Sequence, residues 1–356
     1  MPYADVPTRA ELVDRVAGLV PVLRGHELPA AGPVPAETMA VLSGAGVFRA
    51  PVPRRHGGYG CDSRTLVGVA AQLGRAGAAV AWTAAAHWAS TWLVGVFGAR
   101  ARDEVFGTPG VLVSGTPAAG ATATPVADGF VVDGAWEFVA GAWHAHWQVV
   151  VALAVPSAGA PFPVAALLPR SDLRVTAARP AAGVAGTGGA ATAARGVFVP
   201  AHRVVELSTV YAQWTSAVAG QAASSVGVVL GMALDGWDWY LDGLVADHAT
   251  VPARTTDALA MIDEAEQHAD RLASLVDGHA GADWTEADSA RVRDDLAAAC
   301  GLARDAVHVL AAVSGPGAAE GPAAIRRLAR DLDAAARHVL RGFDDGAGQA
   351  GHHAAA

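Results

Sequence analysis

The chain has 356 residues, of which 52% are hydrophobic and 17% are charged, and its net charge at pH 7 is −9. This composition is typical of a compact globular protein with a sizeable core, and it excludes a disordered chain. The negative charge and the lack of a basic run argue against a nucleic-acid partner, because phosphate binding needs clustered cations.

Two residue types are missing from the sequence, lysine and asparagine. Without lysine the chain can neither form the Schiff base of the usual pyridoxal phosphate enzymes nor carry a Walker-type P-loop. Its two cysteines, Cys61 and Cys300, are far apart and are predicted to be free buried thiols. No signal-like segment and no uninterrupted apolar run of about 18 residues is found, which predicts a cytoplasmic protein without a membrane partner.

The first region, residues 1–109, is predicted to be helical. Apolar periodicity predicts helices over 8–24, 36–43, 63–75 and 78–98, and a short helix begins at Ala101. In the helix over 78–98, Thr83, His87 and Thr91 recur every four residues and share one face with Ser90. Such a polar face is unusual in an alanine-rich helix, so it is a candidate to line a site.

The second region, residues 110–208, changes to short β runs separated by Gly, Pro and Asp turns, which predicts a β-barrel or sandwich domain. The runs are Val111–Ser114, Thr122–Val126, Gly129–Val132, Trp136–Val139, Gln148–Val155, Val164–Leu168, Leu173–Thr176 and Gly196–Val199. Residues 186–191 fit Gly-x-Gly-x-x-Ala. A dinucleotide fingerprint must lead into a helix, whereas this stretch leads into a strand, so a Rossmann site is rejected.

The third region, residues 209–343, is predicted to be an antiparallel four-helix bundle, because four long helices are joined by short Gly- and Pro-containing breaks. The helices are expected near 212–245, 252–278, 285–313 and 322–342. The last residues, 344–356, are small and polar and are predicted to form a disordered tail.

A tryptophan-rich stretch, residues 134–147, lies between two predicted strands. It holds three of the ten tryptophans, Trp136, Trp143 and Trp147, together with His144 and His146. A corner with these groups suits a flat ligand, although tryptophans that fill a core would give the same pattern. No third metal ligand accompanies the two histidines at a suitable spacing, so no metal site is predicted.

Three motifs carry a resemblance to a known family. They are Asp133-Gly-Ala-Trp-Glu-Phe138 with Gly141 and His144-Ala-His-Trp147, Gly186-Thr-Gly188 followed by Val197-Phe-Val-Pro200 and Arg203-Val204, and Arg330-Asp331 with His338. They resemble the acyl-CoA dehydrogenase superfamily, and more closely its flavin-dependent monooxygenase branch. The order of helices, β domain and four-helix bundle is also similar over roughly residues 8–342. The fold class implied is α+β, mainly α.

The resemblance implies an enzyme that binds FMN or FAD in the reduced form, supplied by a separate NAD(P)H:flavin reductase. It implies that dioxygen gives a flavin C4a-hydroperoxide, which oxygenates a small aromatic, polyketide or amine substrate of secondary metabolism. A homo-oligomer, a dimer or tetramer, is also implied. The chain lacks the Tyr-Glu-Gly-Thr segment that accompanies the glutamate base of true acyl-CoA dehydrogenases, which disfavours acyl-CoA oxidation.

The resemblance also assigns residues to roles. His338 and His87 are the implied catalytic residues. The implied cofactor-binding residues are Ser114, Thr116, Trp136, Phe138, Val139, Ala140, Gly141 and Arg293, the last through the flavin phosphate of a neighbouring subunit. The implied substrate-binding residues are Trp82, Thr83, Thr91, Trp143 and His144.

One departure from the pattern separates this chain from the branch. Val139 and Ala140 stand where two serines are expected. A lost hydrogen bond to a charged or polarised group is worth about 1.5–3 kcal/mol. Two alternatives therefore stay open: a flavin enzyme that oxidises or desaturates without oxygenation, and a flavin-free relative that binds or rearranges a biosynthetic intermediate.

Overall fold

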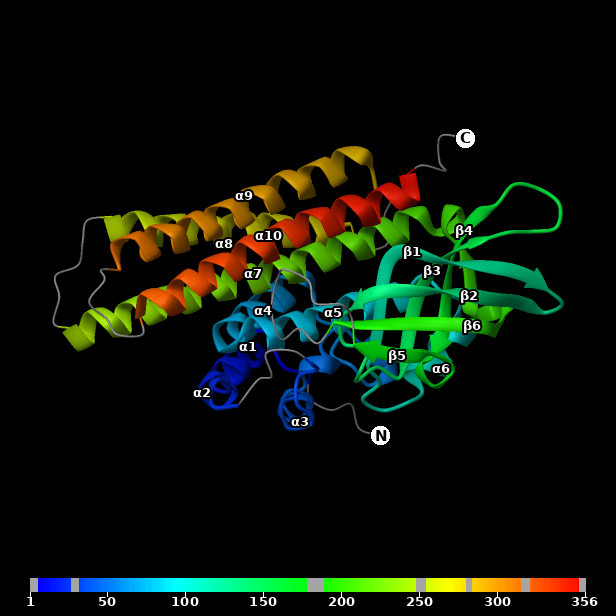
Figure 1. Ribbon diagram of the computed structural model, residues 1–356, viewed down its shortest axis with the longest axis horizontal. Helices are drawn as coiled ribbons and strands as arrows, with labels where there is room; N and C mark the ends of the chain where they lie inside the picture. Colours follow the sequence, from blue (N-terminus) through cyan, green and yellow to red (C-terminus); the bar gives the residue numbers. More distant parts are fainter. Residues whose placement is uncertain are drawn as a thin grey trace.

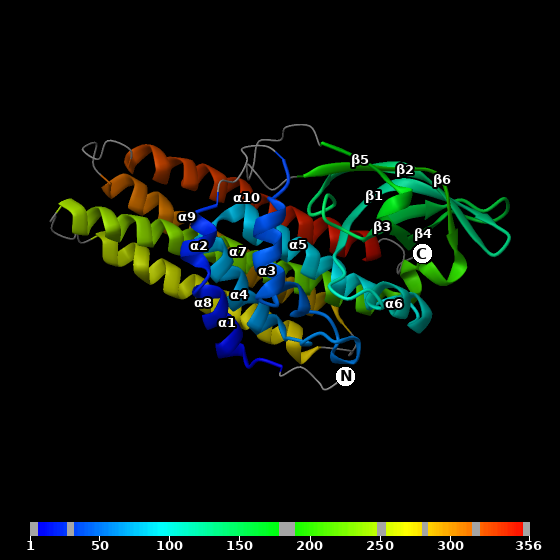
Figure 2. The same ribbon diagram turned by 90° about the horizontal axis from the view of Figure 1, so that it is seen from below.

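The computed structural model describes residues 6–26, 32–177, 189–247, 254–279, 284–314 and 321–351. In chain order, a set of helices is followed by a seven-stranded sheet and then by four long helices. The long helices run side by side, and the sheet lies at one end of them (Figure 1). Turning the molecule shows the first helices packed along the bundle, next to the sheet (Figure 2). The predicted mainly-α arrangement is confirmed.

Six helices form the N-terminal region: α1 (Arg9–Ala17), α2 (Val20–Arg24), α3 (Ala36–Gly44), α4 (Ser63–Ala76), α5 (Ala78–Val94) and α6 (Ala99–Phe106). The prediction of a single helix over 8–24 is wrong, because this segment forms two helices, α1 and α2. Gly18 ends α1, and Pro21 starts the first turn of α2, where its missing N–H does no harm.

Seven strands form one sheet in the order β5-β6-β2-β1-β3-β4-β7. They are β1 (Val113–Val126), β2 (Gly129–Val139), β3 (Trp147–Ala154), β4 (Phe162–Pro169), β5 (Arg174–Ala177), β6 (Ala190–Pro200) and β7 (Val204–Glu206). β1 and β3 are parallel, and the other pairs are antiparallel. Two pairs of predicted runs merge into β1 and β2, because register shifts carry each strand through its irregular middle. The first half of the Gly-x-Gly-x-x-Ala stretch, residues 186–188, lies outside the described residues, and its last two residues begin β6.

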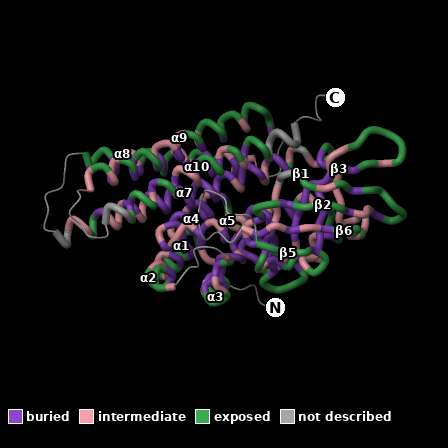
Figure 3. Tube along the Cα trace, viewed as in Figure 1, coloured by how far each residue is buried: buried purple, intermediate pink, exposed green. Residues whose placement is uncertain are grey.

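The sheet separates two hydrophobic cores. Alternate residues of β3 face opposite sides: Val149 and Val151 pack in the main core with the helices, and Val150 and Ala152 pack in a second core with Trp136. Buried residues therefore continue from the helices into the sheet (Figure 3). α5 lies against β1 and β3, and α10 also reaches β1, so these elements meet at one junction.

The C-terminal bundle consists of α7 (Tyr211–Asp247), α8 (Arg254–Gly278), α9 (Glu286–Val313) and α10 (Gly321–Gly351). The four predicted helices are confirmed. The predicted disordered tail is wrong for residues 344–351, which continue α10, and residues 352–356 lie outside the described residues. The extension is held by Arg293, which donates to Asp344 at 2.7 Å and stacks 5.9 Å from the centre of the Phe343 ring.

Two bundle helices, α7 and α9, are long and apolar enough to cross a membrane by length and composition alone. In α7, 83% of the apolar window is buried inside the protein, and the helix packs against α4, α5, α8, α9 and α10. A central core position explains its composition without a membrane. The corresponding window of α9 is 39% buried.

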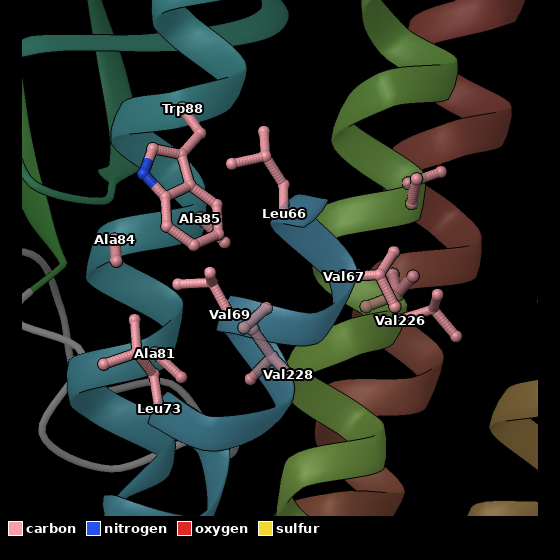
Figure 4. Packing of buried hydrophobic residues seen from close by; sticks show 14 of the residues in the cluster. Leu66, Val67, Val69, Leu73, Ala81, Ala84, Ala85, Trp88, Val226 and Val228 are labelled. Carbon is pink, nitrogen blue, oxygen red and sulfur yellow. The ribbon is translucent and has the colours of Figure 1, made fainter. Parts of the chain in front are cut away.

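The packing of α7 on α4 depends on glycines. A Cβ on Gly231 would lie 2.3 Å from the carbonyl oxygen of Ala71 and 2.6 Å from Cα of Gly74. Around this contact α4 and α5 interdigitate, with Leu66 and Val69 close to Trp88 (Figure 4). The Trp88 indole is fully buried and donates to the Val47 carbonyl at 2.9 Å.

The glycine contact predicts the effect of a single methyl group. Gly231→Ala forces α4 and α7 apart, so we expect the free energy of unfolding to fall by about 1–3 kcal/mol and the melting temperature to fall by roughly 5 °C. Gly243→Ala on the same helix is the matched control, because nothing lies within 4 Å of its Cβ position. Alanine favours a helix over glycine by about 1 kcal/mol, so the control should melt at the same or a higher temperature. Equal melting temperatures for the two variants in calorimetry would contradict the close contact.

Candidate functional site

Two of the predicted site residues meet directly. The rings of Trp82 on α5 and His338 on α10 pack edge to face, with centroids 5.1 Å apart and planes at 63°. They line a cavity of about 30 Å³. Its lining is completed by Val218, Gln221, Ala222, Ser225, Val339, Gly342 and Phe343. A cavity of this size holds one or two water molecules, so a larger ligand enters only if the lining side chains move.

Burial, the largest effect, and the nearby charge of Arg341 lower the pKa of His338, and Asp345 opposes them. A lowered pKa favours the neutral imidazole near pH 7, in which one nitrogen donates and the other accepts. His338 can therefore take a proton from, or return one to, a ligand beside Trp82.

His87 lies at the junction of α5 and β1 and is only 1% exposed. Its Nδ1 lies 2.8 Å from the Val113 carbonyl oxygen. A carbonyl can only accept, so Nδ1 carries the proton. Burial lowers the pKa of His87 to about 4, although the Val113 bond opposes the shift, and the ring is therefore neutral. Nε2 is left with a free lone pair, is buried, and has no partner among the described residues.

The β2–β3 turn wraps around this imidazole. A Cβ on Gly141 would lie 2.7 Å from His87 Nε2, and Gly141 has φ +72°, so both the space and the backbone require glycine. Phe138 precedes it with φ +58° and a side chain that is 50% exposed. A bulky residue in this conformation is uncommon and strained, and such residues cluster at functional sites.

His144 repeats the arrangement of His87 on the other side of the turn. Burial lowers its pKa, and a hydrogen bond to the backbone of Val34 opposes the shift. Its Nε2 is buried without a partner among the described residues, so Nδ1 makes that bond. His146 differs, because its Nδ1 accepts from the Leu112 N–H at 3.0 Å. The turn therefore contributes one buried acceptor nitrogen, His144 Nε2, and α5 contributes the other, His87 Nε2. Trp143, on the same turn, is 36% exposed.

The two residues that replace the expected serines face different environments. Val139 is 0% exposed and packs in the second core of the sheet. Ala140 is half-buried on the turn. A serine at 139 would bury its hydroxyl among apolar side chains, so only position 140 has lost a donor that a ligand can reach.

Several predicted site residues are occupied elsewhere. Trp136 is 2% exposed, donates to the Val151 carbonyl at 3.3 Å and packs in the second core of the sheet. The Thr91 hydroxyl donates to the His87 carbonyl within α5 at 2.8 Å. Ser114 is fully buried, with Oγ 3.5 Å from the Trp147 carbonyl oxygen. Arg293 is paired with Asp344 at the end of the bundle.

The predicted residues that remain at the junction include Thr83, whose buried Oγ1 has no partner among the described residues, and the half-buried Thr116 on β1. The sequence did not indicate Gln221 and Ser225, which line the cavity with His338. Their signal was present in the sequence, because these two polar residues are four apart and share one face of α7.

The junction fits a flat heteroaromatic cofactor. Buried polar atoms without partners are rare in folded proteins, and a bound ligand is one of the few explanations for them. Here Thr83 Oγ1, His87 Nε2 and His144 Nε2 belong to α5 and the adjacent turn. A flavin ring has N–H groups that can donate to the two imidazole nitrogens, and carbonyl oxygens that can accept from the Thr83 hydroxyl. Across the described part of the chain, no group of three His, Cys, Asp or Glu residues could hold a metal ion.

The neutral state of His87 predicts a pH dependence of stability. Its pKa falls from 6.5 to about 4 on folding, so the unfolded chain binds the extra proton between these values. The stability is therefore full above pH 6.5 and is lost as the pH falls towards 4, by up to about 3 kcal/mol. His87→Gln should flatten the fall of melting temperature over this range. His308→Gln removes an exposed histidine of α9 and should keep the wild-type slope; equal slopes for both variants would refute the assignment.

Comparison with known proteins adds independent information. The family model described as "Acyl-CoA dehydrogenase, N-terminal domain" matches residues 13–106, and that described as "Acyl-CoA dehydrogenase, C-terminal domain" matches residues 241–342. Together they cover more than half of the chain.

Curated relatives include the "FADH(2)-dependent resorcinol hydroxylase, oxygenase component" of Rhizobium sp. (strain MTP-10005), with 32% identity over 57% of this chain and 50% of the relative. The "Flavin-dependent monooxygenase, oxygenase subunit HsaA" of Rhodococcus jostii (strain RHA1) is 28% identical over 54% of this chain and 51% of the relative. The chain thus aligns with about half the length of these relatives.

Solved structures match over almost the whole chain. XiaF from Streptomyces sp., in complex with FADH2 and glycerol, superposes with a TM-score of 0.84 and 26% identity over 96% of this chain and 95% of that chain. TdsC from Paenibacillus sp. A11-2 with FMN and indole has a TM-score of 0.78 and 18% identity over 93% of each chain, which shows a shared fold alone. With fold, domain models and relatives in agreement, the chain belongs to the acyl-CoA dehydrogenase family.

Proposed function

We propose that this protein is the oxygenase component of a two-component flavin-dependent monooxygenase. The observation that carries the proposal is His87, a fully buried neutral imidazole with a free Nε2 lone pair at the junction of α5, β1 and the β2–β3 turn. Two further findings support the same function. The curated relatives, of which about half the length aligns, are named as flavin-dependent oxygenase components, and the structural neighbour XiaF was solved with FADH2.

Bound reduced FMN or FAD supplies the electrons that reduce dioxygen, so that one oxygen atom enters the substrate. The residues that would hold it are Thr83, Thr116, Phe138 and Ala140 around the junction, with backbone groups of the β2–β3 turn as further donors. The reduced cofactor comes from a separate NAD(P)H:flavin reductase, because relatives are named as oxygenase components.

Side chains of this protein bind the substrate, exchange protons with it and keep water away from it. The neutral His87 Nε2 accepts a hydrogen bond from a substrate hydroxyl or N–H, and it can take that proton as the substrate becomes more nucleophilic. His338 exchanges a proton on the Trp82 side of the junction. The apolar lining around Trp82 and Phe343 keeps water away from the reacting groups. These features suit a small aromatic, polyketide or amine substrate.

We extend the proposal to the setting of the enzyme. A substrate of secondary metabolism, a cytoplasmic location and a dimer or tetramer accord with the resemblance, and the relatives' names support the reductase partner. A second candidate function is flavin-dependent oxidation without oxygen insertion. Ala140 favours it, because it has no hydroxyl where the branch has a donor.

Replacing His338 tests its role as proton-transfer group. His338→Ala should lower the rate of substrate hydroxylation by about 10²–10⁴-fold, the usual contribution of a general acid or base, while reduced-flavin binding is retained. The assay contains a flavin reductase, NADH and a panel of phenols, and it measures both hydroxylated product and hydrogen peroxide. In His338→Ala, the amount of hydrogen peroxide formed should approach the amount of NADH consumed. His308→Ala on exposed α9 is the control. Unchanged hydroxylation by His338→Ala would exclude the role, and desaturated products from the wild type would favour the second candidate.

Restoring one serine tests the cofactor position. Ala140→Ser adds a hydroxyl at the turn, so we expect reduced FMN or FAD to bind about tenfold more tightly, the effect of one hydrogen bond of about 1.4 kcal/mol. Anaerobic fluorescence titration measures the dissociation constant. Val139→Ser is the matched control: it should leave affinity unchanged and lower the melting temperature, since its hydroxyl is buried without a partner. If Val139→Ser bound reduced flavin more tightly and Ala140→Ser bound it no more tightly than the wild type, position 139 and not 140 would be the one that has lost the donor.

A further inference from the structure

A second cavity lies between α2, α7 and α10, well away from the junction. Its volume is about 280 Å³, near the lower end of the range for small-molecule sites. It is lined by Arg24, Asp235, Trp239, Asp242, Ala324, Ile325 and Leu328. Asp235 is fourteen residues beyond Gln221 on α7, which places the cavity roughly 20 Å along the helix from His338's cavity. It lies towards the end of the bundle that points away from the sheet (Figure 1).

One wall of the cavity is a patterned face of α7. Asp235, Trp239 and Asp242 follow at intervals of four and three residues, so they form one stripe with a carboxylate one turn to each side of an indole. The opposite wall is aliphatic, made by Ile325 and Leu328 of α10. The cavity is thus a slot with an acidic and aromatic side and an apolar side.

Ion pairs leave the slot with surplus negative charge. Arg24 contacts Asp235 at 2.5 Å and Asp238 at 3.5 Å, and Arg75 contacts Asp238 at 2.7 Å. The positive charges of Arg24 and Arg75 therefore neutralise the negative charges of Asp235 and Asp238. Asp242 has no ion pair with any residue that the structure describes, so its charge remains uncompensated at the slot. Burial raises the pKa of Asp235, and the charge and hydrogen bond of Arg24 oppose this shift.

We propose that this slot binds a small organic ammonium ion with an aromatic or aliphatic body. The ammonium would lie between the Asp235 and Asp242 carboxylates and over the Trp239 ring, where cation–π attraction adds to charge attraction. The body of the ligand would pack against Ile325 and Leu328. The site is independent of the proposed oxygenase function, and it shares α7 and α10 with the His338 cavity.

The probe for the test is 2-phenylethylammonium, titrated calorimetrically into the full-length protein, with neutral 2-phenylethanol as the uncharged comparison. We expect saturable binding of one ammonium ion per chain and at least tenfold weaker binding of the alcohol. Asp242→Asn should weaken ammonium binding at least tenfold with unchanged melting temperature. Trp239→Leu should also weaken binding at least tenfold, with a lower melting temperature because Trp239 packs against the core. Asp294→Asn, which removes an exposed carboxylate from α9, is the matched control and should bind as the wild type does.

Three results would overturn the proposal. The first is no saturable binding of the ammonium ion up to about 10 mM, a concentration that would detect even a millimolar site. The second is equally tight binding of 2-phenylethanol, which would mean that the positive charge of the ammonium ion does not contribute to its recognition. The third is undiminished binding by Asp242→Asn. Because no flavin, reductase or turnover enters the measurement, failure of the oxygenase proposal would leave these outcomes unchanged.

Discussion

The close approach of α7 to its neighbours is the constraint on which the rest of the structure depends. Cβ atoms on Gly220, Gly227 and Gly231 would lie 2.2 Å from the Trp92 ring, 2.7 Å from the Val67 carbonyl oxygen and 2.3 Å from the Ala71 carbonyl oxygen, respectively. These glycines let α7 lie directly on α4 and α5. The helix then carries Gln221 and Ser225 to Trp82, and it supports α10, which carries His338. The geometry of the Trp82–His338 cavity thus depends on close backbone packing along α7, which begins at Gly220, the neighbour of Gln221.

Low polarity around the junction determines its electrostatics. No carboxylate or guanidinium makes a hydrogen bond or ion pair with His87, His144 or His338 in the described part of the chain, and burial is the largest cause of the lowered pKa of each. An imidazole that is kept neutral acts as an acceptor and a weak base rather than as an anion-binding cation. The site therefore favours an uncharged, flat ligand with hydrogen-bond donors. The charged groups of the fold are found elsewhere, for example where Glu104 pairs with His202 and Arg203 between α6 and the segment after β6.

The sequence predicted the elements better than it predicted the site. Long apolar periodicity marked the four bundle helices, because each buries one face over many turns. The division at Gly18 and the continuity of β1 and β2 depend on local backbone geometry that periodicity does not report. Among site residues, spacing on α5 correctly grouped Thr83 with His87, but it could not show that the Thr91 hydroxyl turns back to its own helix. Trp136 had both a core and a ligand interpretation, and the placement of β2 puts its side chain in the second core.

Strand geometry changes the meaning of the two missing serines. The register of β2 against β6 shifts between Trp136 and Val139, so Val139, the last residue of the strand, lies in the second core together with Trp136. Its side chain completes the second core, so valine at 139 stabilises the sheet that positions the turn. Ala140 begins the turn, where Gly141 must come within contact distance of His87 Nε2. A small residue at 140 keeps this turn compact beside a strained Phe138. The departure from the branch pattern is therefore one lost donor and not two. His87 Nε2 and Thr83 Oγ1, which have no partner among the described residues, both lie on α5, the helix that Gly141 of this turn approaches.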